Sequence, residues 1–236
     1  MRSARLAAFL AAAALVSACG ARSGGASSDG VTVLAAASLT EAFSALGGAA
    51  FSFAGSQQLV AQVEAGAPAD VVATADADAM ARLVRAGLVH EPRDFARNRL
   101  TIAVEPGNPE GIRGLGDLGR KGLKVVLADP AVPAGRYARE VLDRAGVRVR
   151  PVSLEPDVKA VAGKVLAGEA DGGIVYVSDV PPDAAVPIPD DVNVVATYPV
   201  AVVRATRDRA RAEAFVDRLL GSEGRDALAA HGFLLP

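Results

Sequence analysis

The strongest constraint on the fold is an alternation of short β-branched runs with longer helical segments along nearly the whole chain. Val, Ile and Leu gather in short runs, for example at residues 31–34, 99–104 and 173–177. Between such runs lie segments with apolar side chains on one helical face and glycine at the end, as at residues 136–145. Strands that alternate with helices form mostly parallel sheets with helices on both faces.

The pattern predicts individual elements and their grouping. We expect strands at residues 31–34, 70–74, 99–104, 123–128, 147–152, 173–177, 192–196 and 198–203, and helices at 57–64, 78–86, 136–145, 158–166, 209–220 and 223–230. Ser38-Leu-Thr-Glu41 has the spacing of a capping box, ahead of a short helix at 40–46 and a weak strand near Phe51. Two strand crossings divide these elements into two α/β lobes, residues 31–99 with 200–236 and residues 100–199.

The N-terminus has the features of a secretory signal. Arg2 and Arg5 precede an apolar run at residues 6–18, which is too short to span a bilayer but fits the apolar region of a signal peptide. Val16-Ser-Ala-Cys19 resembles a bacterial lipobox, which predicts that residues 1–18 are removed and Cys19 is lipidated; a buried structural cysteine is the alternative. The Gly- and Ser-rich residues 19–30 then form a tether. We therefore expect a domain lipid-anchored to the cell membrane outside the cytoplasm.

Composition excludes several classes of function. The chain has 25 Lys and Arg against 27 Asp and Glu, a net charge of −2, so it lacks the excess positive charge of a nucleic-acid-binding domain. With one Cys and two His, it can form neither a disulfide framework nor a zinc site built from several such ligands. A binding protein without a bound cofactor or protein-ligated metal is the expectation.

Catalytic motifs are missing from the sequence. There is no G-x-S-x-G, phosphate-binding P-loop or H-E-x-x-H pattern. We interpret His90 and His231 as surface residues near helix ends. Asp76 and Asp78 could form a metal-binding pair, but a turn with a helix N-cap explains them better. The Gly-rich residues 111–119 are expected to form a loop.

Helix starts are the better candidates for binding. Four predicted strand-to-helix junctions carry donor groups, at Ser38, Ser56, residues 133–135 and residues 156–158. A helix start presents unpaired backbone N–H groups and a partial positive charge, which suits an anion without Lys or Arg. Taken singly, each junction could be an ordinary N-cap. Pro133-Ala134-Gly135 differs, because Ala134 offers no side-chain cap and Gly135 permits close approach of a ligand.

Five segments carry a resemblance to a known family. They are Ala35-Ala-Ala-Ser-Leu-Thr-Glu41, Phe53-Ala-Gly-Ser56, Gln62-Val-Glu-Ala-Gly-Ala-Pro-Ala-Asp70, Asp129-Pro-Ala-Val-Pro-Ala-Gly-Arg-Tyr-Ala138 and Gly173-Ile-Val-Tyr-Val-Ser-Asp179. In this order they resemble the periplasmic or lipoprotein molybdate-binding proteins of molybdate ABC importers, which are type II periplasmic binding proteins. The similarity extends over about residues 31–233. The stretch between Ser38 and Ser56 is about two helical turns shorter than in the family, which calls the stability of the first lobe into question.

The resemblance implies a fold, a ligand and a site. The family folds as two α/β lobes that close on a tetrahedral oxyanion held by uncharged donors and deliver it to an ABC permease. Carried onto this chain, the ligand-facing groups are the hydroxyls and amides of Ser38 and Ser56, the amides of Ala134 and Val158, and the hydroxyl of Tyr176. The expected ligands are molybdate and tungstate, bound by a monomer that performs no catalysis.

Three alternatives remain open at the level of sequence. The same module could bind sulfate, thiosulfate or another tetrahedral oxyanion. It could serve as an extracytoplasmic oxyanion sensor, although a lipobox without a transmembrane helix disfavours this. An enzyme with this fold that anchors its cofactor on a cysteine would need a cysteine other than Cys19, and the chain has none.

Overall fold

The structure, a computed structural model, describes residues 30–236. The predicted signal peptide, Cys19 and all but the last residue of the predicted tether lie outside the described residues. The strands are β1 (Val31–Ala36), β2 (Ala49–Ala54), β3 (Val71–Ala73), β4 (Arg93–Val104), β5 (Val125–Ala128), β6 (Ser153–Glu155), β7 (Gly172–Tyr176), β8 (Ala185–Pro187) and β9 (Val195–Val202). The α-helices are α1 (Thr40–Leu46), α2 (Ser56–Glu64), α3 (Ala77–Arg85), α4 (Pro133–Arg144), α5 (Val158–Leu166), α6 (Arg209–Leu220) and α7 (Ser222–Ala230), and the 3₁₀ helices are η1 (Ala37–Leu39), η2 (Leu115–Gly119), η3 (Val177–Asp179) and η4 (Pro182–Ala184).

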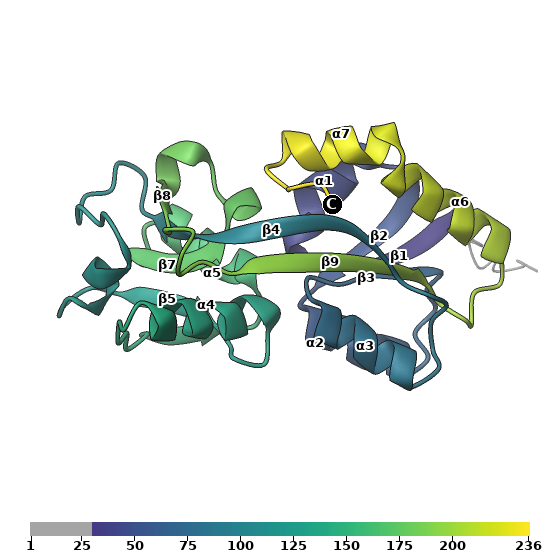
Figure 1. The fold of residues 1–236 in the computed structure, drawn as a ribbon, viewed down its shortest axis with the longest axis horizontal. Coiled ribbons are helices and arrows are strands. Elements are labelled where there is room, and N and C mark those ends of the chain that lie inside the picture. The colour runs from purple at the N-terminus through teal and green to yellow at the C-terminus, as the bar shows by residue number, and fades with distance from the viewer. Residues whose placement is uncertain (1–29) are drawn as a thin grey trace, which may run out of the picture.

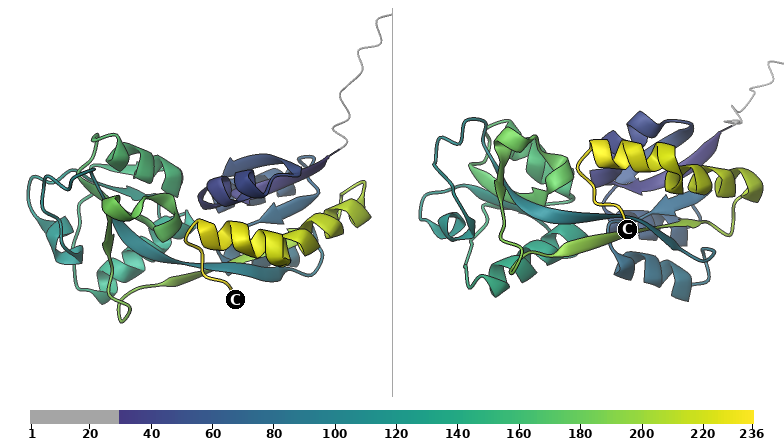
Figure 2. Two further views of the ribbon diagram at one scale, coloured as in Figure 1. Left: turned by 90° about the horizontal axis from the view of Figure 1, so that it is seen from above. Right: turned by 45° about the horizontal axis from the view of Figure 1, so that its top comes forward.

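Two lobes lie side by side along the long axis of the molecule, and β4 and β9 run between them (Figure 1). We call the elements β1–β3, α1–α3, α6 and α7 the first lobe, and β5–β8, α4 and α5 the second lobe. Two further directions of view show the same arrangement (Figure 2). The strands follow the order β2-β1-β3-β9-β4-β7-β5-β6, with β8 paired to β4.

Strand β4 connects the lobes because its two halves pair with different strands. Its first half pairs with β9, up to Arg99 opposite Val195, and its second half pairs with β7, beginning with Leu100 opposite Tyr176. These pairings are antiparallel, whereas β1 pairs in parallel with β2 and β3, and β5 with β6 and β7. Parallel pairing is therefore confined to the outer part of each lobe, where a helix connects successive strands.

Alternating side chains bury both faces of the first-lobe sheet. Val33 on β1 belongs to a core that includes Phe43 of α1 and Phe215 of α6, while the next residue, Leu34, packs in a separate cluster with Leu59 of α2 and Leu83 of α3. Successive residues of a strand point to opposite faces of the sheet. Helices therefore cover the first-lobe sheet on both sides, and the predicted α/β class is confirmed.

Aromatic packing supports the short stretch between Ser38 and Ser56. Phe43 of α1 is fully buried and contacts Phe51, Phe95 and Phe215, with ring centroids 5.7, 5.8 and 6.3 Å away. Phe51 and Phe53 of β2 stack at 5.7 Å. The seven-residue helix and the edge strand are thus fastened by large side chains, each of which buries more apolar area than a small aliphatic one.

Most predicted elements form with boundaries shifted by a few residues, but three predictions are wrong. Residues 147–152 form no strand; the chain pairs only afterwards, when Ser153 comes opposite Val126 of β5. The strands expected at 192–196 and 198–203 are one strand, β9, because β4 pairs with it across residue 197. Strand β4 starts at Arg93, before the apolar run, because its polar first half is held by β9.

Candidate functional site

A small cavity lies where the two lobes meet. The first lobe contributes residues that include Ser38, Ser56 and Ala75, and the second lobe contributes Ala134, Val158 and Tyr176 among others. All five residues predicted to face the ligand line this one cavity. Its volume is about 10 Å³, far below the roughly 300–1,000 Å³ typical of pockets for organic ligands. The cavity therefore excludes an organic ligand of ordinary size.

Three α-helices begin at the cavity wall: α2 at Ser56, α4 at Pro133 and α5 at Val158. The first amides of a helix have no acceptor within it, so those of Ser56, Ala134 and Val158 can donate to a ligand. Helices α2 and α4 also have no side-chain cap, since their N-cap residues are Gly55 and Val132. Helix α5 is capped by Asp157, whose carboxylate accepts a hydrogen bond from the amide of Ala160 at 2.9 Å.

Gly135 also has a structural role beside the predicted one. It is not among the residues that line the cavity. A Cβ at this position would lie 2.4 Å from the carbonyl oxygen of Ala128 and 2.1 Å from that of Asp129. A side chain would therefore push α4 away from the end of β5. Gly135 lets the helix start pack against the strand, and this packing positions Ala134.

Ser38 does not act as a helix cap, and the predicted capping box is wrong. Helix α1 begins after Leu39 without a side-chain cap. The Ser38 hydroxyl lies 2.9 Å from the hydroxyl of Tyr198 on β9, and Glu41 pairs with Lys159 instead of reaching back to the helix start. Tertiary partners on other elements compete successfully for both side chains.

The other two hydroxyls of the cavity differ in their partners. The Ser56 oxygen accepts a hydrogen bond from the amide of Ala75 at 3.0 Å. The Tyr176 hydroxyl is buried and has no hydrogen-bond partner among the described residues. Burial raises the pKa of Tyr176 well above its usual value, so it keeps its proton at neutral pH. An unpaired buried donor is costly unless a ligand accepts from it.

Ion pairs next to the cavity connect the two lobes. Arg136 of α4 lies 3.0 Å from Asp76, the N-cap of α3, and 3.7 Å from Asp78. Lys159 of α5 lies 2.6 Å from Glu41 of α1. Each cation follows a cavity-lining amide by one or two residues, yet neither lines the cavity. They neutralise carboxylates across the lobe interface instead.

Asp179 is a buried acid next to this interface. Its carboxylate accepts a hydrogen bond from the amide of Tyr176 at 3.0 Å and lies 3.3 Å from Lys159. Burial raises the pKa of Asp179 to about 6, although the charge of Lys159 opposes this shift. Asp179 connects the strand end that presents Tyr176 to the ion pair between the lobes.

Other candidate residues take structural roles. Asp76 caps α3 by accepting from the amide of Ala79, and within residues 30–236 no group of three His, Cys, Asp or Glu is placed to hold a metal ion. His231, the C-cap residue of α7, contacts the carbonyl oxygen of Ala227, and His90 lies in the segment between α3 and β4. Both histidines are half-buried. Residues 111–119 form a loop that ends in η2. In this part of the chain, no helix has the length and apolar character to cross a bilayer.

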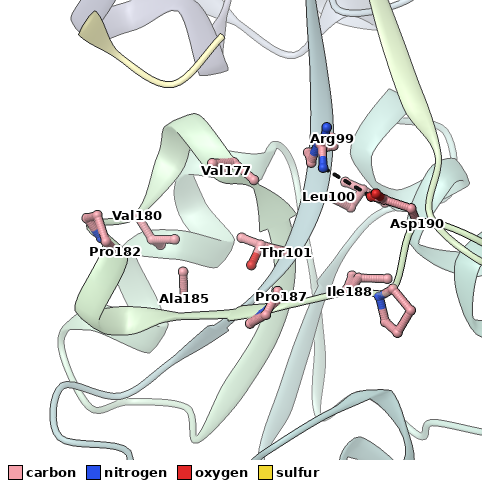
Figure 3. A pocket seen from close by; sticks show the side chains of 11 residues that line it. Arg99, Leu100, Thr101, Val177, Val180, Pro182, Ala185, Pro187, Ile188 and Asp190 are labelled. Carbon is pink, nitrogen blue, oxygen red and sulfur yellow. Dashed lines mark hydrogen bonds and ion pairs between the residues drawn. The ribbon is translucent and has the colours of Figure 1, made fainter. Parts of the chain in front are cut away.

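A larger groove of about 550 Å³ lies on the second lobe (Figure 3). Its lining is mainly apolar, with Val177, Pro187 and Ile188 among the residues. The polar groups there have protein partners: Arg99 pairs with Asp190 at 3.0 Å, and the Thr101 hydroxyl donates to the carbonyl of Val186. This groove lacks the free donors found in the cavity between the lobes.

The sequence did not predict the groups that hydrogen-bond to the cavity residues or connect the lobes beside the cavity. Tyr198 and the amide of Ala75 hold the two serine hydroxyls, and Arg136 and Lys159 connect the lobes. No local pattern marks these residues, because each acts on a partner at least 19 positions away. Among these residues, only Arg136 has a local indication of its role, because it directly follows the helix start Pro133-Ala-Gly.

The chain is similar to a family of solute-binding proteins and to individual molybdate- and sulfate-binding proteins. The family model described as bacterial extracellular solute-binding protein matches residues 31–234. The molybdate-binding protein ModA of Mycobacterium tuberculosis is 40% identical over 221 residues, which cover 87% of this chain and 85% of that protein. The periplasmic molybdate-binding protein of Azotobacter vinelandii matches with a TM-score of 0.75 at 20% identity, covering 87% and 99% of the two chains. The sulfate-binding protein SubI of M. tuberculosis matches with a TM-score of 0.68 at 20% identity, covering 86% and 85%.

Proposed function

The chain belongs to the bacterial extracellular solute-binding proteins, and from this premise we propose that it captures molybdate, and tungstate with it, in the cavity between the lobes and delivers it to an ABC permease. Such proteins act in transport outside the cytoplasm and carry out no catalysis. The observation that carries the proposal is a cavity between two lobes lined by uncharged donors, with one buried hydroxyl, that of Tyr176, left for a ligand to satisfy.

The proposed binding groups are the hydroxyls and amides of Ser38 and Ser56, the amides of Ala134 and Val158, and the hydroxyl of Tyr176. Helix starts supply partial positive charge to an anion without a mobile counter-charge. Charge-assisted hydrogen bonds are worth about 1.5–3 kcal/mol each. About seven of them, less the cost of association and closure, are consistent with micromolar to nanomolar affinity.

The donor set favours an oxyanion that carries no proton. Molybdate and tungstate are unprotonated dianions at neutral pH, so every oxygen can accept hydrogen bonds. Monohydrogen phosphate would bring an O–H group that needs an acceptor, and an unmet donor costs about 1–3 kcal/mol. Asp157 also lines the cavity, and its Oδ1 accepts a hydrogen bond from the amide of Ala160 as the N-cap of α5.

Sulfate is the alternative ligand, because a sulfate-binding protein shares the fold. Sulfate has the same charge and no proton but shorter bonds from its central atom to oxygen. A cavity set for the longer bonds of molybdate would stretch hydrogen bonds to sulfate beyond their good range of about 2.7–3.2 Å. The 40% identity to a molybdate-binding protein favours molybdate.

Binding is proposed to close the lobes, which comprise residues 31–99 with 200–236 and residues 100–199. The change of β4 partners between Arg99 and Leu100 supports this division. Contacts across the interface would form on closure: the two ion pairs described above, and a hydrogen bond from Gln57 Nε2 to the carbonyl of Pro156 at 3.2 Å. We further propose that the chain works as a monomer, lipid-anchored to the membrane through Cys19 after loss of residues 1–18.

Thermal unfolding of the purified protein tests the ligand. A ligand a thousandfold above its Kd adds about 4 kcal/mol of stability, which raises the Tm by several degrees. We expect molybdate and tungstate to raise the Tm, and sulfate and phosphate to leave it nearly unchanged. An equal rise with sulfate would favour the general oxyanion binder. No rise with any of the four would refute an oxyanion site and leave a sensor of another ligand.

A further inference from the structure

The partners behind the cavity determine what each serine offers to a ligand. A serine hydroxyl has one proton to donate and two lone pairs with which to accept. If its proton is used within the protein, it presents a lone pair to the cavity and accepts from the ligand. If a protein group donates to it, its proton is free for the ligand.

Ser56 is set as a donor by the backbone. The amide of Ala75 lies 3.0 Å from Ser56 Oγ, and a backbone amide can only donate. This bond occupies a lone pair of Ser56 and leaves the hydroxyl proton for another acceptor. Ser56 is 2% exposed and lines the cavity, so the ligand is the acceptor within reach.

Ser38 depends on a side chain. Its oxygen lies 2.9 Å from the hydroxyl of Tyr198, and either oxygen could be the donor in this geometry. The Tyr198 ring is fully buried and is held edge-on by Phe95 and Phe233, with centroids 6.3 and 5.3 Å away. Burial, and the nearby charge of Asp179, raise the pKa of Tyr198 well above its usual value, so the hydroxyl keeps its proton. A rigid, protonated phenol beside Ser38 is a fixed potential donor.

We infer that Tyr198 is a positioning and specificity residue that makes Ser38 a donor: Tyr198 donates to Ser38 Oγ, and the Ser38 proton then faces the cavity. This inference rests on the proposed function, in which both serines donate to an oxyanion. With Ala75 behind Ser56 and Tyr198 behind Ser38, each serine has one lone pair occupied by a protein donor and its proton free for the ligand. Groups that do not touch the ligand thus favour oxyanions without a proton over protonated ones.

Sulfate and monohydrogen phosphate are the probes that isolate this effect, because they are close in size and differ in the proton. Each is tested at about pH 8.5 for its ability to displace bound molybdate from the full mature protein. In Tyr198→Phe the ring packing is kept, but Ser38 is released to accept from the P–OH group. We expect the preference for sulfate over phosphate to narrow by about tenfold, the size of one buried hydrogen bond.

Ser38→Ala gives an independent test of the direction of the bond. If Ser38 donates to the ligand, its loss weakens sulfate and phosphate by a similar factor, and Tyr198→Phe then adds no further change in their ratio. Tyr137→Phe, which removes a tyrosine hydroxyl from α4 outside the cavity lining, is the matched control and should leave the ratio unchanged.

Two results would overturn the inference. One is an unchanged ratio in Tyr198→Phe. The other is a Ser38→Ala variant that loses phosphate more than sulfate, since that would mean that Ser38 accepts from the ligand. Absence of molybdate binding by the unmodified protein would instead remove the proposed function itself, so the two failures are distinguishable.

Discussion

Arg136 provides the sharpest test of lobe closure. Its guanidinium reaches from α4 to Asp76 at 3.0 Å and to Asp78 at 3.7 Å, both on the first lobe. The carboxylate of Asp76 is 3% exposed and keeps its bond to the amide of Ala79. Arg136→Met removes the charge and retains the unbranched stem. If the lobes separate without ligand, both charges return to water there, so the substitution destabilises only the closed form.

The magnitude follows from the exposure of the pair. Exposed ion pairs contribute about 0–1 kcal/mol, and hydrogen bonds to charged groups about 1.5–3 kcal/mol. Arg136 is 39% exposed, so solvent screening places the value near 1 kcal/mol. The Kd for molybdate should therefore rise about fivefold. Because the contact forms after encounter, the change should appear as faster dissociation with little change in association.

Isothermal titration and stopped-flow dissociation measure these quantities, and Arg82→Met is the matched control. Arg82 pairs with Glu64 at 2.6 Å, but both residues lie in the first lobe. This variant should leave the Kd unchanged. The reasoning is refuted if Arg136→Met binds within twofold of the parent, or if Arg82→Met weakens binding to the same extent, since that would indicate a general effect of losing an ion pair.

Three further predictions test the site and the fold. Val158→Pro removes one amide donor at the first position of α5, where proline is tolerated because the preceding Asp157 already has an extended backbone. Calorimetry should show that molybdate binds at least tenfold more weakly, and circular dichroism should show an unchanged helix content. Folding raises the pKa of Asp179 from 3.8 to about 6, so between about pH 4 and pH 6 the folded state keeps a proton that the unfolded state loses, and stability falls as the pH rises. The fall in Tm over this pH range should disappear in Asp179→Asn, and an equal fall in the variant would contradict the assignment. Phe43→Ala should lower the free energy of unfolding by about 3–5 kcal/mol in urea, since the ring is fully buried, and a loss below 1 kcal/mol would show that the short first-lobe segment does not depend on it.

The sequence predicted the helices better than the strands. Helices α5 and α6 have the predicted bounds, because apolar periodicity and a closing glycine are local signals. The strand expected at 147–152 and the start of β4 were misplaced, because strand bounds depend on partners distant in sequence. Pairing of Ser153 with Val126, or of Arg93 with Val200, cannot be predicted from either segment alone.

The sequence by itself determined the class of fold and the local chemistry of the site. Alternating runs specify α/β lobes, and the helix starts at Ser56, Ala134 and Val158 supply donors wherever the helices come to lie. Tertiary structure decided how these groups are used. It brought the helix starts of two lobes to one cavity, left Tyr176 unpaired there, and set Tyr198 and the amide of Ala75 behind the two serines. The reason is physical: backbone donors follow from local conformation, whereas the direction of a hydroxyl proton depends on which group the fold places beside it.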